Sequence, residues 1–370
     1  MRHNPRVSKI IFFAILYLLT SIFIISLIQF HGLTDERTGV ICMVDFNAHK
    51  PFAYRILMPS IIRFIDISTP GSIKYRISKW MSGMIIDKQK TVYADIPEKI
   101  KSIQDENGYR IAIYQVLNLL SLFMFLLSLR LMAKNLIDLS ESAYNILPLG
   151  MAVVIPVFLD YPNYMYDFLN LFLFTAGLIL LYREKWNLYL IILTLAILNK
   201  ETAILLSVVF VIFYFNKIDR PMFFSLLAIQ VGLFVIIKLS LYFIFKDNPG
   251  GFVELHLLRN LSYLSKASNY FRFESISTCL LSLSGLNFPV PRGLNLFVIA
   301  LVALTVFWGW FSKSLFLRKS AIIAIILFVL CLPFGHIEEL RDYYEALPII
   351  YLLGVSGLLK MMKSFGIIKP

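Results

Sequence analysis

Two charged stretches near the start of the chain contain side chains that could carry chemistry. Asp35 and Glu36 directly follow the first long apolar run, and Asp45 lies further along the same loop. A carboxylate at a membrane boundary loses part of its hydration, which raises its pKa toward the range of a general base. Arg55 stands between aromatic and apolar residues in the stretch Pro51–Pro59. Its guanidinium is therefore expected at headgroup depth, where it can fork onto a phosphate or simply snorkel to the interface.

Polar residues also interrupt the apolar runs in the middle of the chain. Asp167 begins an apolar run after the aromatic stretch Tyr161–Tyr166, and Lys200-Glu201 divides the apolar stretch from Trp186 to Phe215. A helix of about 13 residues rises only about 20 Å, well short of the ~30 Å hydrocarbon core of a bilayer. Non-helical backbone at that depth must be buried in protein or line a wet cavity. The Lys200–Glu201 pair is expected either to face such a cavity or only to hold two short helices together.

A third polar stretch precedes the last apolar run. Glu338 and Arg341 are three residues apart there, so on one helical turn their side chains can pair. His336 with Glu338 could bind a cation, although a single His-x-Glu spacing has little specificity. The chain has no Gly-rich phosphate loop, no Gly-x-Ser-x-Gly and no His-Glu-x-x-His motif, so soluble nucleotide-binding chemistry is not supported.

The elements that must position these residues are apolar helices. The 370 residues are 58% hydrophobic and 16% charged, whereas soluble domains are about 45–50% apolar and about 25% charged. With the broken stretch from Trp186 to Phe215 counted as a hairpin, the apolar runs predict an all-α polytopic membrane protein with about ten transmembrane helices. The other runs are Ile10–Phe30, Ile111–Met132, Ala143–Leu159, Met165–Tyr182, Met222–Phe245, Leu294–Phe311, Ala321–Phe334 and Tyr344–Leu359.

The distribution of basic residues predicts the orientation. They gather at the termini and in the short loops of one side, while the short loops of the other side contain only Lys200 and Arg341. By the positive-inside rule the basic side is cytoplasmic, and both termini are expected there. Two long segments, 31–110 and 246–293, then lie outside. The net charge of +12 is explained by this bias and by lipid headgroups, so no nucleic acid is expected as a partner.

The first outer segment is expected to contain two amphipathic interfacial helices. Residues Arg55–Ile67 and Ile73–Ile86 are rich in apolar side chains and also carry Lys and Arg. Such helices lie in the headgroup plane rather than crossing it. They either only pack on the bundle or wall a lipid-facing cavity. Because no linker or internal repeat marks a second unit, residues 1–370 are expected to form a single transmembrane domain.

The order of these motifs, all on the expected outer side, resembles that of bacterial integral-membrane glycosyltransferases of the GT-C superfamily. The resemblance extends from about residue 10 to residue 360, and each motif alone is degenerate. In chain order the motifs are Asp35-Glu36, Phe52–Pro59, Tyr166-Asp167, Asn199–Thr202 and Glu338-x-x-Arg341.

The resemblance implies an enzyme that takes a sugar from a polyprenyl-phosphate donor and transfers it to a cell-envelope glycan or lipid. The reaction would occur at the outer face of the bacterial inner membrane, among membrane lipids. Known members use an acidic residue of the first outer loop as base or metal ligand, which carries the role to Asp35, with Glu36 beside it. Asp45 is a competing acid in the same loop, and a divalent cation is the cofactor that the resemblance allows. The expected substrate- and phosphate-binding residues are Arg55, Asp167, Lys200, Glu201, Glu338 and Arg341.

Two other functions remain open from the sequence. A transporter or flippase for a lipid-linked or anionic solute would use the same cavity without chemistry, although the repeat symmetry of many transporters is missing here. An O-antigen-type polymerase would also act on lipid-linked sugars.

Overall fold

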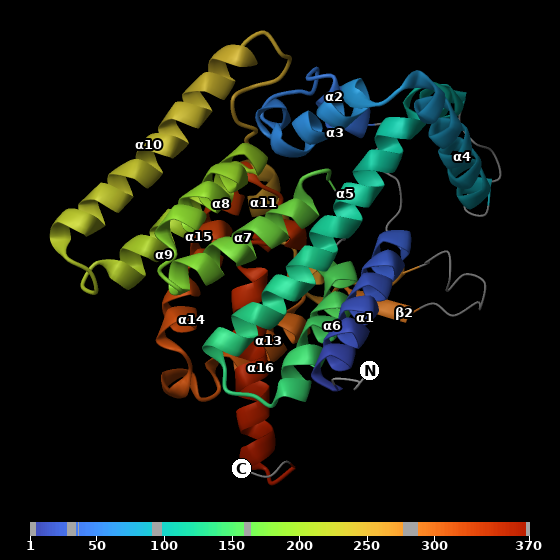
Figure 1. The fold of residues 1–370 in the computed structure, drawn as a ribbon. Coiled ribbons are helices and arrows are strands. Elements are labelled where there is room, and N and C mark those ends of the chain that lie inside the picture. Colours follow the sequence, from blue (N-terminus) through green and yellow to red (C-terminus); the bar gives the residue numbers. More distant parts are fainter. Residues whose placement is uncertain are drawn as a thin grey trace.

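The structure, a computed structural model, is largely helical, and it describes residues 5–27, 35, 37–90, 98–158, 164–276 and 288–367 (Figure 1). The elements of the first half are α1 (Pro5–Leu27), α2 (Val40–Val44), η1 (Phe52–Tyr54), α3 (Leu57–Ser68), α4 (Gly71–Lys90), α5 (Glu98–Leu136), α6 (Glu141–Phe158) and α7 (Asp167–Tyr182). Those of the middle are α8 (Trp186–Asn199), η2 (Glu201–Ile204), α9 (Leu205–Tyr214), α10 (Arg220–Ile244), α11 (Leu257–Leu264), η3 (Ala267–Phe271), β1 (Phe273–Ile276) and β2 (Phe288–Pro291). The last are α13 (Leu296–Phe307), η4 (Trp310–Ser312), α14 (Leu315–Ser320), α15 (Ile322–Phe334), η5 (Leu340–Tyr343) and α16 (Leu347–Ser364).

Five helices in the described part of the chain are long and apolar enough to cross a membrane, which confirms the coarse prediction of a helical membrane protein. They are Ser8–Ser26, Asn107–Leu136, Arg220–Ile244, Leu315–Phe334 and Leu347–Ser364. Five shorter apolar helices are Glu141–Ile155, Asp167–Tyr182, Trp186–Asn199, Glu201–Tyr214 and Leu296–Phe307. Each of the ten expected spans coincides with one of these helices. The shorter ones fall below the roughly 20 residues that a perpendicular crossing needs, so the count of ten stays a prediction.

Residues 37–90, which contain α2, η1, α3 and α4, form a helical cap at one end of the bundle (Figure 1). The two predicted amphipathic helices are present as α3 and α4, and α3 begins at Leu57 rather than Arg55 because the preceding residues form the turn η1. Helix α4 lies closely along α5. A side chain at Gly108 would collide with the backbone of Ser78, and the Tyr109 amide donates a hydrogen bond to Ser78 Oγ at 2.9 Å.

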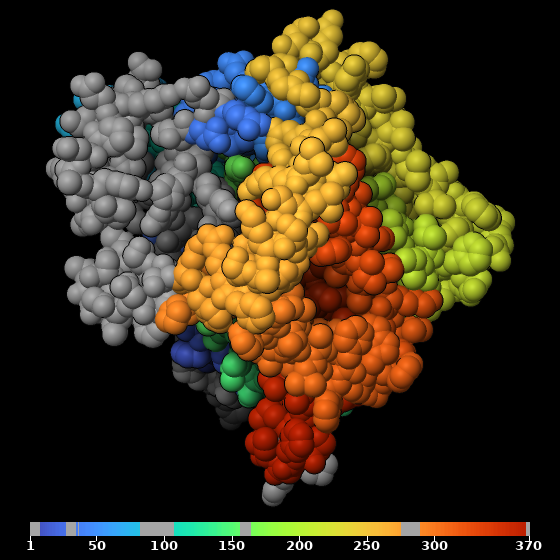
Figure 2. Space-filling model, turned by 180° about the vertical axis from the view of Figure 1, so that it is seen from behind, coloured from blue at the N-terminus to red at the C-terminus, as the bar shows by residue number. Residues whose placement is uncertain are grey.

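The cap also contacts the chain that follows α10. The Lys50 amide donates to the Pro249 carbonyl at 2.8 Å, and Asn248 Nδ2 donates to the Phe46 carbonyl at 2.8 Å. Figure 2 shows the same neighbours, with the blue first segment against the yellow-orange chain after α10. The two long segments predicted to lie on one side of the membrane are therefore in direct contact.

The one strand pair among the described residues is the only departure from an all-α fold there. Strands β1 and β2 pair antiparallel, with Phe273 opposite Pro291 and Ile276 opposite Phe288. The ribbon belongs to the second long segment, where the apolar runs predict no spanning helix.

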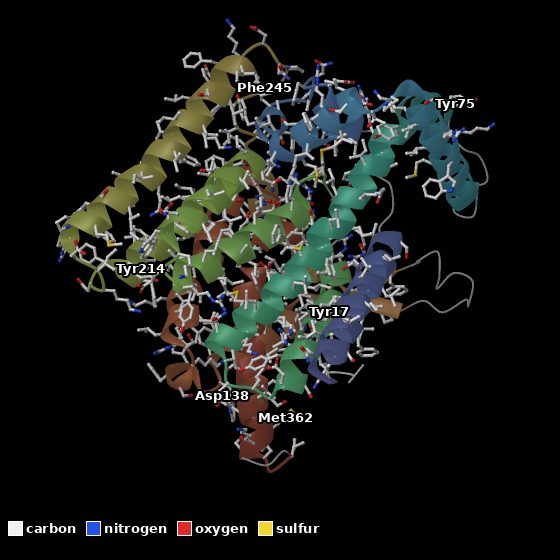
Figure 3. All side chains as sticks on the ribbon, viewed as in Figure 1. Tyr17, Tyr75, Asp138, Tyr214, Phe245 and Met362 are labelled. Carbon is white, nitrogen blue, oxygen red and sulfur yellow. The ribbon has the colours of Figure 1, made fainter. Side chains whose placement is uncertain are left out.

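Two hydrophobic cores meet below the cap. The larger one is built from the bundle helices and includes Phe168 and Leu206, both fully buried. The smaller one joins the cap to the ends of α7 and α10 and includes Met58, Tyr166 and Leu241. Figure 3 shows that Tyr75 and Phe245 lie at this cap end, whereas Asp138 and Met362 lie at the opposite end. The start of α7, between Tyr166 and Phe168, is the boundary between the two cores.

Candidate functional site

The break in the stretch from Trp186 to Phe215 is a true hairpin. Helix α8 ends at Asn199, Lys200 is extended, and the turn η2 leads into α9. The ring of Trp186, at the start of α8, lies 5.1 Å from that of Tyr214, at the end of α9, so the two helices run antiparallel. Asn199 Nδ2 donates to the Tyr166 carbonyl at 3.0 Å, which fixes the turn to the start of α7. The prediction of two short helices is therefore confirmed.

Glu201 in this turn binds Arg55 of the cap through both carboxylate oxygens. Arg55 Nη2 lies 2.5 Å from Glu201 Oε1, and Arg55 Nε lies 3.2 Å from Oε2. The Arg55 side chain is buried, whereas the Glu201 side chain keeps 39% of its surface exposed. Burial favours the neutral guanidinium, but the carboxylate beside it more than offsets this and holds the pKa of Arg55 above its ordinary value. The pair therefore stays ionised and faces solvent only through Glu201.

Two tyrosine rings just before α7 each have an arginine guanidinium over one face. Arg55 lies over the ring of Tyr166 with its Cζ 4.2 Å from the centroid, and Arg341 lies over Tyr164 at 3.8 Å. The two rings contact each other, with centroids 5.5 Å apart. Desolvated guanidinium groups on aromatic faces gain attraction from the ring quadrupole. The rings thus bring together two cations that are far apart in sequence.

Arg341 also interacts with two acids. Its Nη2 lies 2.5 Å from Glu339 Oε2, and its Nη1 lies 3.8 Å from Asp167 Oδ2. Asp167 in turn accepts a hydrogen bond from the Tyr164 amide at 2.9 Å. Burial, opposed by the Arg341 charge, raises the pKa of Glu339 above its ordinary value.

The pairing of Arg341 with Glu338 that the spacing allows does not form. Glu338 instead accepts from Arg259 Nη2 of α11 at 2.6 Å. The rule for residues three apart assumes an α-helix, but Glu339 is extended and the helical turn begins only at Leu340, so Glu338 lies outside it. Glu338 therefore leaves the cluster around Asp167 and ties the second long segment to the end of α15.

Lys200 and Glu201 do not pair with each other either. Lys200 Nζ lies 3.2 Å from Oε1 of Glu345, a residue with no exposed surface. Asn170 Nδ2 donates to the same Oε1 at 2.9 Å, and Thr202 also hydrogen-bonds it. The extended backbone at Lys200 sends successive side chains in opposite directions, which separates the two partners.

The predicted catalytic acids Asp35 and Asp45 make their contacts with residues outside this group of charged side chains. Asp35 is exposed and accepts from the Arg37 amide at 2.7 Å and from Thr38 Oγ1 at 3.0 Å, an arrangement that precedes α2. Asp45 lies 2.9 Å from Arg110, which also binds Asp66 at 3.0 Å. Glu36 lies outside the described residues. Asp35 keeps a solvent-facing carboxylate, whereas Asp45 is held in a salt bridge.

Two charged residues of the cluster have no place in the sequence-based interpretation. Glu345 stands at the edge of the last apolar run, which is predicted to be a membrane span. Lys238 is a lone charge well inside the apolar helix α10, and its charge interacts with those of Glu201 and Arg55. An ionisable residue within an apolar run is the signal that could have found both.

Within the described ranges of the chain, four basic and four acidic side chains make up this charged cluster at the boundary of the two cores. The basic ones are Arg55, Lys200, Lys238 and Arg341, and the acidic ones are Asp167, Glu201, Glu339 and Glu345. Among the described residues no group of three or more His, Cys, Asp or Glu side chains is arranged to hold a metal ion. The arrangement can bind and orient an anionic group through its basic members.

Comparisons of the chain with protein-family models, with curated proteins and with solved structures gave no match. The class that the fold defines is thus a helical protein with several helices suited to a membrane and a charged cluster at one end of its bundle.

Proposed function

We propose that this chain is a GT-C-type glycosyltransferase of the bacterial inner membrane. It moves a sugar from a polyprenyl-phosphate donor to a cell-envelope glycan or lipid at the outer face. All ten apolar helices cross the membrane, both termini are cytoplasmic, and the cap lies outside. The grouping of the cap and the second long segment at one end, opposite Asp138 and Met362, supports this orientation.

The observation that carries the proposal is the bidentate contact of Arg55 with the half-exposed Glu201. Arg55 gives Nε and Nη2 to Glu201, and the guanidinium keeps its Nη1 donors for a phosphate. The ring of Tyr166 fixes its plane, with the Arg55 Cζ 4.2 Å from the ring centroid. The contact joins the cap to a hairpin of short apolar helices, so a lipid phosphate at headgroup depth can approach it from the bilayer.

The transfer step then needs one base and one anion-binding group. Asp35 takes the proton of an acceptor hydroxyl as the hydroxyl oxygen attacks the anomeric carbon of the donor. The bond from that carbon to the phosphate oxygen breaks, and the phosphate leaves with the electron pair. Arg55 and Arg341 stabilise the charge that develops on it. The exposed carboxylate of Asp35 is available for this role, whereas that of Asp45 is engaged by Arg110.

The test uses the purified protein in liposomes with a panel of short-chain polyprenyl phosphates that carry radiolabelled sugars. A lipid extract of bacterial envelopes provides acceptors. The expected result is release of polyprenyl phosphate together with a covalent labelled product, both lost in Asp35→Asn. Movement of the labelled lipid across the vesicle with no covalent product from any donor would show a carrier, and the proposal would then be wrong.

A second variant separates the base from its competitor. Asp45→Asn removes the partner of Arg110 but not the proposed base, so it should retain transfer if the protein is folded. Transfer that survives Asp35→Asn but is lost in Asp45→Asn moves the base to Asp45 and leaves the enzyme class standing.

A further inference from the structure

Lys238 has a buried ammonium group without a hydrogen-bonding partner. Its Nζ is buried and has no hydrogen-bonding partner in the described part of the chain. It interacts with the charges of Glu201 and Arg55 but does not reach hydrogen-bond distance of Glu201. An ammonium carries three donors, and leaving them unmet in a protein interior is costly. Such a group in a native fold calls for a ligand that is not part of the chain.

Ordinary snorkelling does not explain this lysine. Lys238 is six residues before the end of α10 at Ile244, which is about 9 Å along the helix. A lysine near a helix end can bring its ammonium to the headgroups while its stem lies along apolar surface. Here the ammonium instead points into the protein, toward the Arg55–Glu201 pair.

A second unmet polar group accompanies it. The hydroxyl of Tyr54 is buried and has no hydrogen-bonding partner among the residues that the structure describes. Tyr54 belongs to the turn η1, next to Arg55 in sequence, and its ring lies 5.9 Å from that of Phe252. The ring of Tyr242, one turn after Lys238 on α10, also lies 5.9 Å from that of Phe252. Phe252 therefore links η1 to α10 one turn beyond Lys238, and Arg55, which follows Tyr54 in sequence, interacts with the Lys238 charge.

Lys238 has no acid of its own. The carboxylate whose charge it meets is that of Glu201, which Arg55 already binds, whereas Lys200 has its own acid in Glu345. One anionic group would give Lys238 a partner and accept hydrogen bonds from both unmet donors. A phosphate oxygen suits this task because it accepts from ammonium, hydroxyl and guanidinium donors alike.

We propose that Lys238 and Tyr54 form a phosphate-binding site that Arg55 completes. The phosphate is that of an amphiphile whose tail lies along α10, where the lipid-facing side chains Ile236 and Phe243 are each 65% exposed. That the amphiphile is the polyprenyl-phosphate donor rests on the proposed function. Lys238 is then a substrate-binding residue. It belongs to α10, whose sequence otherwise predicts only an apolar membrane-spanning helix.

The experiment measures binding of radiolabelled short-chain polyprenyl phosphate, without sugar, to the full-length protein in nanodiscs. The variants are Lys238→Met, Lys238→Arg and Tyr54→Phe, and Lys246→Met removes an exposed lysine beyond the same helix as a matched control. Lys238→Met should weaken binding about 10–100-fold, the usual size of a lost charged hydrogen bond. Tyr54→Phe should weaken it less, and Lys238→Arg and Lys246→Met should bind within a few-fold of the unchanged protein.

The thermal stability of the ligand-free variants separates binding from structure. Because the ammonium is unmet without ligand, Lys238→Met should melt at the same temperature as the unchanged protein or higher. Unchanged binding by a folded Lys238→Met overturns the inference. A clear drop in its melting temperature, with affinity unchanged in the molecules that remain folded, assigns Lys238 a structural role and overturns it as well.

Competition identifies the source of the phosphate and keeps this inference apart from the proposed function. Inorganic phosphate that displaces the labelled lipid as effectively as unlabelled polyprenyl phosphate does would show that the tail contributes nothing, and would overturn the assignment to a lipid. Lys238-dependent lipid binding without any sugar transfer supports the site and refutes the enzyme. Full sugar transfer by Lys238→Met, with lipid binding intact, refutes the site and leaves the enzyme standing.

Discussion

The pairing of Lys200 with the fully buried Glu345 allows a sharp test of the site's architecture. At 3.2 Å and an effective dielectric constant of about 20, the two charges attract each other by about 5 kcal/mol. Lys200→Met removes this attraction and leaves a desolvated carboxylate behind. Breaking a buried pair in this way costs about 3–5 kcal/mol. The hydrogen bonds from Asn170 and Thr202 to Glu345 persist, so we expect about 3 kcal/mol.

A double-mutant cycle isolates the pair. Glu345→Gln alone strands the Lys200 ammonium and should also cost about 3 kcal/mol, whereas the double variant buries no charge and should cost well under the sum of the two. The free energy of unfolding is followed by tryptophan fluorescence during titration of mixed micelles with a denaturing detergent. Lys185→Met, which removes an exposed lysine at the start of α8, is the control and should stay within about 0.5 kcal/mol.

Two results would refute this reasoning. A loss from Lys200→Met no greater than that from the control would mean that the ammonium is solvated. Coupling of Lys200 to Glu201→Gln rather than to Glu345→Gln would restore the pairing that the sequence alone suggests, and would displace Glu345 from the cluster.

Three further outcomes are expected. Asp35→Asn should lower the rate of sugar transfer about 10²–10⁴-fold, the usual contribution of a general base, with binding of polyprenyl phosphate to nanodiscs nearly unchanged. Arg55→Lys should weaken that binding, because a lysine keeps the charge but cannot bind Glu201 through one edge and a phosphate through the other; binding equal to that of the unchanged protein would contradict this role. The melting temperature should fall as the pH is lowered from about 6.5 toward 4, and His336→Gln should reduce that fall.

The helices and the hairpin are predictable from sequence because both follow from the lengths of the apolar runs. An apolar run of about 20 residues and a break between two shorter ones have few structural solutions in a bilayer. The two amphipathic helices follow from composition in the same way. The antiparallel ribbon of β1 and β2 is not predictable in this manner, since its residues carry no strong alternating pattern.

Membership of the charged cluster is partly predictable, but its pairings are not. Arg55 and Glu201 both interrupt apolar sequence, which marks them, yet nothing in the spacing shows that they form one fork across 146 positions. Glu338 was expected in the cluster and lies outside it because a 3-10 turn begins just after it. Pairings depend on tertiary contacts between distant elements, and such contacts leave no local signal in a single sequence.

The pH prediction rests on the surroundings of His336 at the far side of the cluster. Burial, the neighbouring Arg259 and then His256, whose ring lies 4.1 Å away, lower the pKa of His336 to about 4, although Asp342 opposes this. The unfolded chain, with a histidine pKa of about 6.5, therefore binds more protons between pH 6.5 and 4, and stability falls as the pH falls. The raised pKa of Glu339 acts with the opposite sign, since its folded carboxyl binds the extra proton. Glu339 is present in both proteins, so subtracting the pH profile of His336→Gln from that of the unchanged protein cancels its contribution. Identical slopes of melting temperature against pH in the two proteins would contradict the assignment to His336.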